Sequence, residues 1–320
     1  MRYSIARPGV PVIWLDTHAI TDLLEAQEQA NPTAADRGLR SLFDRLLELR
    51  RARRIFIFET DQIYEIEGRP ELVEGSSRIL SQLSQGVRTN YRTVLQNQTI
   101  QAIDSLVAGF DDVVLPFRTA FDTDPFAAQQ TGRFIIRAHR APSTDEINER
   151  TVHAEDLAGQ WEHLRSHADR KIPFAKRREA RRQIELVGHQ DAIRQVVAEG
   201  PRRVLDGRWI DRVSSPFAMW RNRGGEDSID AFVAFFGSDH YTALPFVQVY
   251  SALAAHIISS SQPIRRGDVM DLNHIAAAMP YCTHMVLDRS MIAAVKDLGL
   301  DSEYGTTVLR LNQLGAELPH

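Results

Sequence analysis

The stretch that decides the fold is Val10-Pro11-Val12-Ile13-Trp14-Leu15-Asp16-Thr17-His18. Its apolar run over residues 10–15 is short and continuous, which is typical of a strand that is buried on both faces. Helical periodicity follows over residues 17–29, with Thr17 as the expected N-cap. A buried strand that passes directly into a helix predicts an α/β unit with parallel strands.

Three further segments have the same strand-like character. Ile55-Phe56-Ile57-Phe58 follows a helix expected over residues 36–51, and another helix is expected to begin with Thr60 as its cap. Met285-Val286-Leu287 and Thr306-Thr307-Val308-Leu309 provide strands near the C-terminus. We therefore expect an α/β domain with a central, mainly parallel sheet that both ends of the chain build.

The middle of the chain has a different character. Residues 89–240 consist of long polar, helical stretches broken by prolines, with weak strand signals only at Val113-Val114-Leu115 and Phe134-Ile135-Ile136. The sequence thus predicts a mostly helical insertion at 89–240, between a first part of the α/β domain at 1–88 and a second part at 241–320. Residues 241–264 contain no Asp, Glu, Lys or Arg, but their polar residues favour a buried core helix over a membrane span.

Composition limits the partners of this 320-residue chain. It has 38 Lys and Arg against 42 Asp and Glu, a net charge of −4, so any surface for a polyanion must be local. The single cysteine, Cys282, cannot form an internal disulfide, which agrees with a reducing compartment. Because the first residues lack the apolar core of a signal peptide, we expect a cytoplasmic protein without a membrane partner.

Acidic residues stand after strands and at the starts of helices. Ligands of α/β sheets bind at the carboxyl ends of the strands, so these acids are expected to meet at one edge. The spacing of Asp268 and Asp271 places both on one helix face. Carboxylates that converge without Lys or Arg repel one another and normally bind a hard cation such as Mg²⁺ or Mn²⁺. The candidate ligands and catalytic residues are Asp16, Glu65, Asp268, Asp271 and Asp288.

Alternatives remain open for these acids. Glu59, Asp61 and Glu67 lie close to Glu65 in the sequence and could take its place, and the sequence does not decide between Asp268 and Asp271. An acid after a strand or in the first turn of a helix can also serve as an N-cap. His18 and His274, which lie near the acids in sequence, could contact substrate or simply pack or cap.

Two parts of the chain resemble PIN-domain nucleases. Val12-Ile13-Trp14-Leu15-Asp16-Thr17-His18 is similar to that family's opening strand and its first metal-binding Asp. Residues 267–276, followed by Pro280-Tyr281-Cys282 and Val286-Leu287-Asp288-Arg289, resemble its later acidic motifs. The resemblance covers about 16 residues at the start and about 30 near the end. It implies a PIN-like fold with three layers (α/β/α) in which Asp16, Glu65, Asp271 or Asp268, and Asp288 are successive acidic ligands.

The resemblance also implies an activity, namely hydrolysis of RNA phosphodiester bonds with Mg²⁺ or Mn²⁺, in which the ion activates a water molecule. The alternative is a catalytically inactive PIN-like module that binds RNA or a protein. A third possibility is another Mg²⁺-dependent phosphohydrolase, although Asp16-Thr17-His18 lacks the Asp-x-Asp motif of haloacid-dehalogenase enzymes. RNA is thus the expected substrate and DNA is not excluded, while a second copy of the chain or an inhibitory protein stays open as a partner.

One local segment is strongly basic. Residues 165–182 carry eight Lys and Arg against Asp169 and Glu179, which is the best candidate surface for a phosphate backbone. A solvated helix face is the alternative. The residues predicted to bind nucleic acid are Arg170, Lys171, Lys176, Arg177, Arg178, Arg181 and Arg182.

Overall fold

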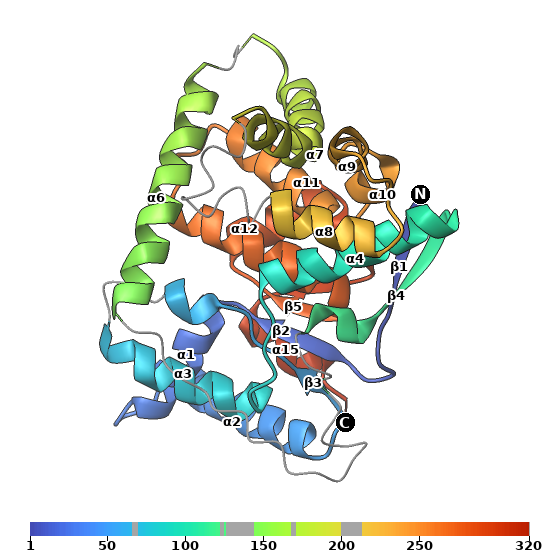
Figure 1. Ribbon diagram of the computed structural model, residues 1–320. Coiled ribbons are helices and arrows are strands. Elements are labelled where there is room, and N and C mark those ends of the chain that lie inside the picture. The colour runs from blue at the N-terminus through green and yellow to red at the C-terminus, as the bar shows by residue number, and fades with distance from the viewer. Residues whose placement is uncertain (66–69, 122–124, 126–143, 168–170, 200–212, 320) are drawn as a thin grey trace.

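The computed structural model describes residues 1–65, 70–121, 125, 144–167, 171–199 and 213–319 (Figure 1). It is an α/β protein with parallel sheets, compatible with a three-layer α/β/α fold. Its elements in chain order are β1 (Arg2–Ala6), β2 (Val12–Leu15), α1 (Thr17–Glu28), α2 (Ala34–Arg51), β3 (Phe56–Ile57), η1 (Gln62–Glu65), α3 (Pro70–Ser84), α4 (Tyr91–Ala108), β4 (Asp112–Pro116), η2 (Phe117–Ala120), α6 (Thr144–Ser166), α7 (Phe174–Glu199), α8 (Ser215–Asn222), α9 (Ile229–Phe235), α10 (Asp239–Thr242), α11 (Pro245–Ser259), α12 (Arg266–Ala278), η5 (Met279–Tyr281), β5 (His284–Val286), α13 (Arg289–Asp297), α14 (Leu300–Tyr304), β6 (Thr307–Leu309) and α15 (Leu311–Glu317).

The central sheet joins the two ends of the chain. Its strand order is β3-β2-β5-β6, and every neighbouring pair is parallel. All four residues of β2 are buried, as the continuous apolar run predicted. Figure 1 shows α1, α2 and α3 on one side of the sheet and α4, α11 and α12 on the other. The strands predicted from residues 10–15, 55–58, 285–287 and 306–309 are thus confirmed as β2, β3, β5 and β6. Three of them are shorter than predicted, and β5 is shifted by one residue.

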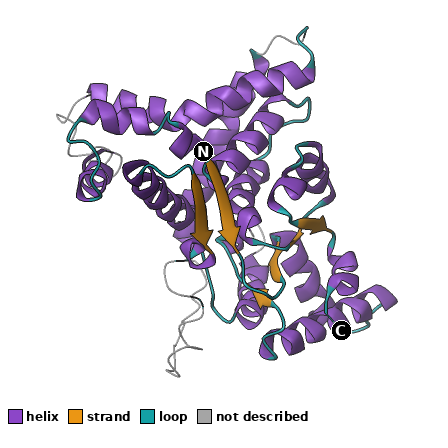
Figure 2. Ribbon diagram, turned by 90° about the vertical axis from the view of Figure 1, so that its right-hand side faces the viewer, coloured by secondary structure: helices purple, strands orange, loops and turns teal. Residues whose placement is uncertain are grey.

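A second, two-stranded sheet was not predicted. β1 pairs in parallel with β4, with Arg2 opposite Asp112 and Ala6 opposite Pro116. Figure 2 shows these two strands side by side, separate from the central sheet. The strand signal at 113–115 is confirmed by β4, whereas β1 alternates exposed and half-buried residues without a strong apolar signal. The predicted strand at 134–136 lies outside the described residues.

The segment at 89–240 packs closely against the rest of the protein. In α4, Gln98 donates from Nε2 to the Tyr281 hydroxyl (3.0 Å) and accepts from the Phe246 backbone N–H (3.0 Å). Phe117 in η2 meets Phe56 of β3 edge to face, with ring centroids 5.3 Å apart. One hydrophobic core therefore includes residues from this segment and from both ends of the chain. The division into an insertion and two parts of one domain stays a prediction.

The apolar segment at 241–264 forms α11, a helix with twelve buried residues. This confirms the buried core helix. In the described residues, no single helix is long and apolar enough to cross a membrane. One bent pair, Ile229–Thr242 with Pro245–Ser259, meets the same criteria of length and composition, with 83° between its two parts.

Two predicted helix starts were wrong. Asp16, not Thr17, is the N-cap of α1, and its carboxylate accepts a hydrogen bond from the Thr17 backbone N–H (2.7 Å). Thr60 caps no α-helix, because the chain after it forms the single 3-10 turn η1. The buried Gln62 side chain accounts for this turn, since it accepts hydrogen bonds from both the backbone N–H and the hydroxyl of Thr60. These bonds replace the cap that Thr60 would have formed.

Candidate metal centre

The site begins where β2 and β5 end. Leu15 and Val286 are opposite each other in the parallel register, and the Asp16 backbone N–H donates to the Val286 carbonyl (3.1 Å). Asp16 and Asp288 therefore follow neighbouring strands at the same edge of the sheet. The Asp16 carboxyl group is buried, with 7% of the residue exposed.

Glu65 reaches this edge through the turn η1. Gln62, the first residue of the turn, donates from Nε2 to the Leu15 carbonyl (2.9 Å), which ties η1 to the end of β2. The Thr17 hydroxyl contacts both the Gln62 carbonyl (3.1 Å) and the Glu65 carboxylate. These bonds hold the Glu65 side chain over the start of α1, beside Asp16.

Asp271 comes from the other side, from helix α12. In the described residues, no hydrogen bond or ion pair is found for its carboxylate. Asp268, one turn earlier, accepts from the Arg265 backbone N–H (2.7 Å) and thereby caps its own helix. Of the two acids that the sequence could not separate, Asp271 is the one that joins Asp16 and Glu65.

These three residues, Asp16, Glu65 and Asp271, form a cluster that we call the acidic triad. One carboxylate oxygen from each lies within 4.8 Å of those from the other two. The triad could hold a metal ion, since three carboxylate oxygens at this separation match the ligands of a hard cation. In the part of the chain that the structure describes, no lysine or arginine forms an ion pair with Asp16 or Asp271.

Burial and mutual repulsion make the triad unfavourable when it is fully charged. Burial, and then the neighbouring Glu65 carboxylate, raise the pKa of Asp16 to about 7. The same two causes, in the same order, hold the pKa of Asp271 well above its usual range. A divalent cation would remove this penalty, because it neutralises carboxylates that otherwise repel one another in a poorly solvated site.

One histidine also faces the triad. The Nε2 atom of His274 lies 2.9 Å from Oε1 of Glu65, and their side chains are 7% and 11% exposed. Burial is the largest single influence and lowers the pKa of His274, but the negative charges of Glu65, Asp61 and Asp16 together outweigh it, so the pKa is raised. His274 lies on α12 one turn after Asp271, so one helix face supplies both a carboxylate and a cation to the same site.

Asp288 lies at the same sheet edge but outside the triad. Its Oδ1 atom accepts from the Met291 backbone N–H (2.8 Å) and from the Ser290 hydroxyl (2.7 Å), as the N-cap of α13. It is close enough to contribute to the raised pKa of both Asp16 and Asp271. The assignment of Asp268 and Asp288 as metal ligands stays a prediction.

The sequence alternatives to Glu65 have other partners. Asp61 forms an ion pair with Arg88, whose Nε atom lies 3.1 Å from Asp61 Oδ1. Glu59 accepts from the Ser84 hydroxyl (3.2 Å). Glu67 lies outside the described residues. Of the described candidates near this turn, Glu65 is therefore the one that belongs to the triad.

Most of the described part of the basic segment lies at the start of α7, while Arg165 belongs to the last turn of α6. Its arginines make contacts within the fold: Arg178 pairs with Asp297 of α13, and Arg182 donates to Gln248 Oε1 of α11 (2.6 Å). Two other arginines of the segment also contact the fold. Arg181 forms an ion pair with Glu185, and Arg177 donates to the carbonyls of Ile172 and Ser259.

Of the other three residues predicted to bind nucleic acid, Lys171 and Lys176 are exposed, and Arg170 lies outside the described residues. The exposed lysines are thus the positions of this segment most accessible to a polyanion. The prediction that the segment binds nucleic acid remains untested by these contacts.

Sequence reasoning gave no role to Thr17 beyond capping and left His274 as a residue near the acids. The sequence spacing of Asp271 and His274, three apart on one helix, is the signal that could have linked them. Comparison of the chain with protein-family models, with curated proteins and with solved structures found no match.

Proposed function

We propose that this protein is a metal-dependent ribonuclease that hydrolyses RNA phosphodiester bonds at the acidic triad. The observation that carries the proposal is the convergence of Asp16, Glu65 and Asp271, whose ligand oxygens lie within 4.8 Å of one another at the carboxyl edge of a parallel sheet. The sequence resemblance to PIN-domain nucleases at residues 12–18 and 267–289 also supports it.

An all-oxygen ligand set favours Mg²⁺ or Mn²⁺ over softer metals. When bound, such an ion lowers the pKa of a water molecule and stabilises the negative charge that develops on a phosphodiester in hydrolysis. Asp16 and Asp271 would hold it, because their carboxylates have no lysine or arginine partner among the described residues. Glu65 would complete the ligand set, oriented by the Thr17 hydroxyl on one side and His274 on the other.

The chain itself contributes position and polarity. The bonds from η1 to β2 fix Glu65, and the helix start at Thr17 fixes Asp16. Because both acids are held by backbone elements of the core, little reorganisation is needed on binding. Asp288, at the edge of the site, adds negative charge on the side that opens to solvent.

The test is cleavage of labelled single-stranded RNA and DNA by the purified protein in Mn²⁺, Mg²⁺ or EDTA. Asp16→Asn and Asp271→Asn are expected to abolish cleavage, and Asp44→Asn, an exposed position on α2, serves as the matched control. Thermal unfolding of each variant verifies that it is folded. Cleavage that persists in both triad variants would refute the proposal, and metal-independent binding without any products would favour the inactive module instead.

A further inference from the structure

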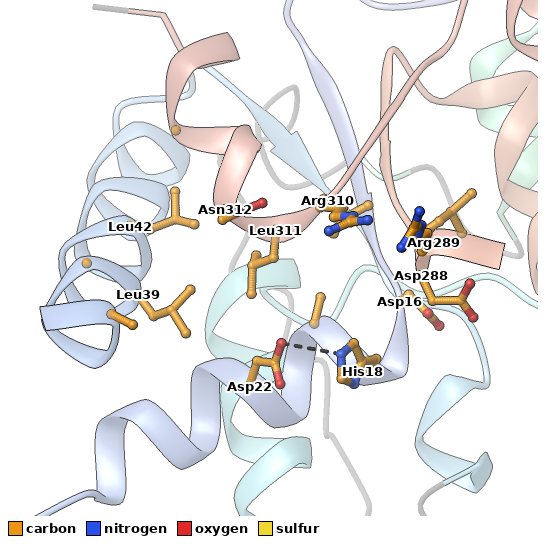
Figure 3. Close-up of a pocket in the computed structure, with 16 residues that line it drawn as sticks. Asp16, His18, Asp22, Leu39, Leu42, Asp288, Arg289, Arg310, Leu311 and Asn312 are labelled. Carbon is orange, nitrogen blue, oxygen red and sulfur yellow. Dashed lines mark ion pairs between the residues drawn. The ribbon is translucent and has the colours of Figure 1, made fainter. Parts of the chain in front are cut away.

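A pocket of about 720 Å³ opens beside the acidic triad (Figure 3). Its walls come from α1, α2, the start of α13 and the start of α15. Figure 3 shows Asp16 and Asp288 on one side, Leu39 and Leu42 on the other, and Leu311 between them. This volume is in the range of pockets that bind small molecules or single groups of a polymer.

The rim of the pocket carries two arginines. Arg289 directly follows Asp288, and Arg310 directly follows the last residue of β6. Both are exposed, and within the described ranges neither guanidinium forms an ion pair with a carboxylate. Unpaired guanidinium groups bind phosphate oxygens through two parallel hydrogen bonds. The rim therefore provides positive charge next to a site that is otherwise strongly acidic.

The far wall is apolar. Leu39 and Leu42 of α2 are half-buried and Leu311 of α15 is buried, while the exposed amide of Asn312 lies beside them. A nucleobase is complementary to such a wall, because its flat face packs on apolar side chains and its polar edge forms hydrogen bonds. A base can reach such a wall only after it has left its stack, which a single strand permits at low cost.

We propose that this pocket binds one nucleotide of a single-stranded nucleic acid next to the phosphodiester at the acidic triad. The base packs against Leu39, Leu42 and Leu311, and the backbone phosphates lie against Arg289 and Arg310. The inference rests on the proposed function, since it names the part of the substrate that the same site recognises. It predicts that single strands bind more tightly than duplexes of the same sequence.

The chain offers a helix position from which a larger side chain can be directed at the pocket. Gly38 of α2 lines it, and a Cβ atom added there meets no heavy atom within 4 Å. Gly38→Phe therefore places a ring in the pocket from an accessible helix position. The matched control is Gly188→Phe on α7, where an added Cβ also meets no heavy atom within 4 Å and which does not line the pocket. For the rim, Arg310→Ala is compared with Arg194→Ala, an exposed arginine of α7.

The measurement is fluorescence anisotropy of a short fluorescein-labelled single-stranded RNA in EDTA, a condition in which it stays intact. Gly38→Phe and Arg310→Ala are each expected to weaken binding about tenfold, whereas the two control variants bind as the wild type does. Annealing the RNA to its complement is expected to weaken binding by a similar factor. If Gly38→Phe does not fold, Arg310→Ala and the duplex comparison still decide.

Three outcomes overturn the inference: no measurable binding by the wild type, equal binding of duplex and single strand, or normal binding by Gly38→Phe together with Arg310→Ala. Cleavage assays on the same proteins separate the two proposals. Cleavage that Gly38→Phe leaves unchanged, with normal binding, rejects the pocket and keeps the nuclease. Binding that depends on the pocket, without metal-dependent products, keeps the pocket and rejects the nuclease.

Discussion

The imidazole Nε2 atom of His274 lies 2.9 Å from Oε1 of Glu65, in a site where both side chains are nearly buried. It is a positive partner for one member of the triad, while Asp16 and Asp271 have no such partner among the described lysines and arginines. Of the three carboxylates, Glu65 is thus the one with a histidine beside it that can carry a positive charge. The remaining negative charge is what a cation would neutralise.

Removal of His274 is expected to destabilise the metal-free protein strongly. His274→Ala leaves the buried Glu65 carboxylate without its partner, which costs about 3 kcal/mol of the free energy of unfolding. A bound divalent cation replaces part of the lost positive charge, so the loss should be smaller in Mn²⁺ than in EDTA. Urea unfolding in both buffers measures it. His18→Ala, which removes an exposed contact with Asp22 at 3.6 Å, is the control and should change little. An equal loss for His274→Ala in both buffers would contradict this account.

Stability of the metal-free protein is expected to fall as the pH rises towards and beyond 7. Burial and Glu65 raise the pKa of Asp16 from 3.8 to about 7, so the folded state binds this proton more tightly than the unfolded state does. The stability contributed by the protonated group is fully present below the unfolded pKa and is lost as the pH rises through the folded pKa. The raised pKa of His274 acts in the same direction.

The measurement is the urea midpoint in EDTA across this pH range, for the wild type and for Asp16→Asn. The asparagine variant should show a shallower fall, because it has no proton to lose. In Mn²⁺ the fall should also be smaller, because the ion binds the deprotonated carboxylates. A wild-type midpoint that is constant or rises over this range would show that other groups dominate.

Asp288 is expected to have separable roles in stability and in catalysis. Asparagine caps helices about as well as aspartate, so Asp288→Asn should keep the stability of the wild type, whereas Asp288→Ala should lose about 1 kcal/mol. If the carboxylate charge is required at the site, both variants lose RNA cleavage. Urea unfolding and cleavage in Mn²⁺ are measured on the same preparations. Full cleavage by the asparagine variant would show that Asp288 serves only as the cap of α13.

The exposed lysines of the basic segment are expected to contribute to RNA affinity. Replacement of both Lys171 and Lys176 by Ala should reduce the slope of log affinity against log salt by about 1.4, because each phosphate contact contributes about 0.7 for a single strand. Arg178→Ala is the comparison, because its ion pair with Asp297 joins α7 to α13. That variant should change the unfolding midpoint more than the salt slope. An unchanged slope for the lysine variant would leave the segment as a solvated helix face.

The sequence by itself determined the central sheet and the sheet edge at which the acids gather. Residues 12–15 and 285–287 are apolar runs followed directly by Asp16 and Asp288, and neighbouring parallel strands present their carboxyl ends at the same edge of the sheet. Local sequence patterns were sufficient to predict these strands, because a strand buried on both faces appears in the sequence as a short, continuous apolar run. They were not sufficient for β1, which has no strong apolar signal of its own and pairs with β4, about 110 positions later in the chain.

Only the tertiary structure decided which acids meet. Glu59, Asp61 and Glu65 are equally acidic in the sequence, but Ser84 and Arg88 from a later segment engage the first two and leave Glu65 for the triad. Asp268 and Asp271 share a helix face, yet the first bonds to the exposed start of α12 and the second is directed at Asp16 and Glu65. The physical reason is that the partner of a carboxylate is set by tertiary packing. These partners come from segments distant in the sequence, which local sequence patterns do not relate to one another.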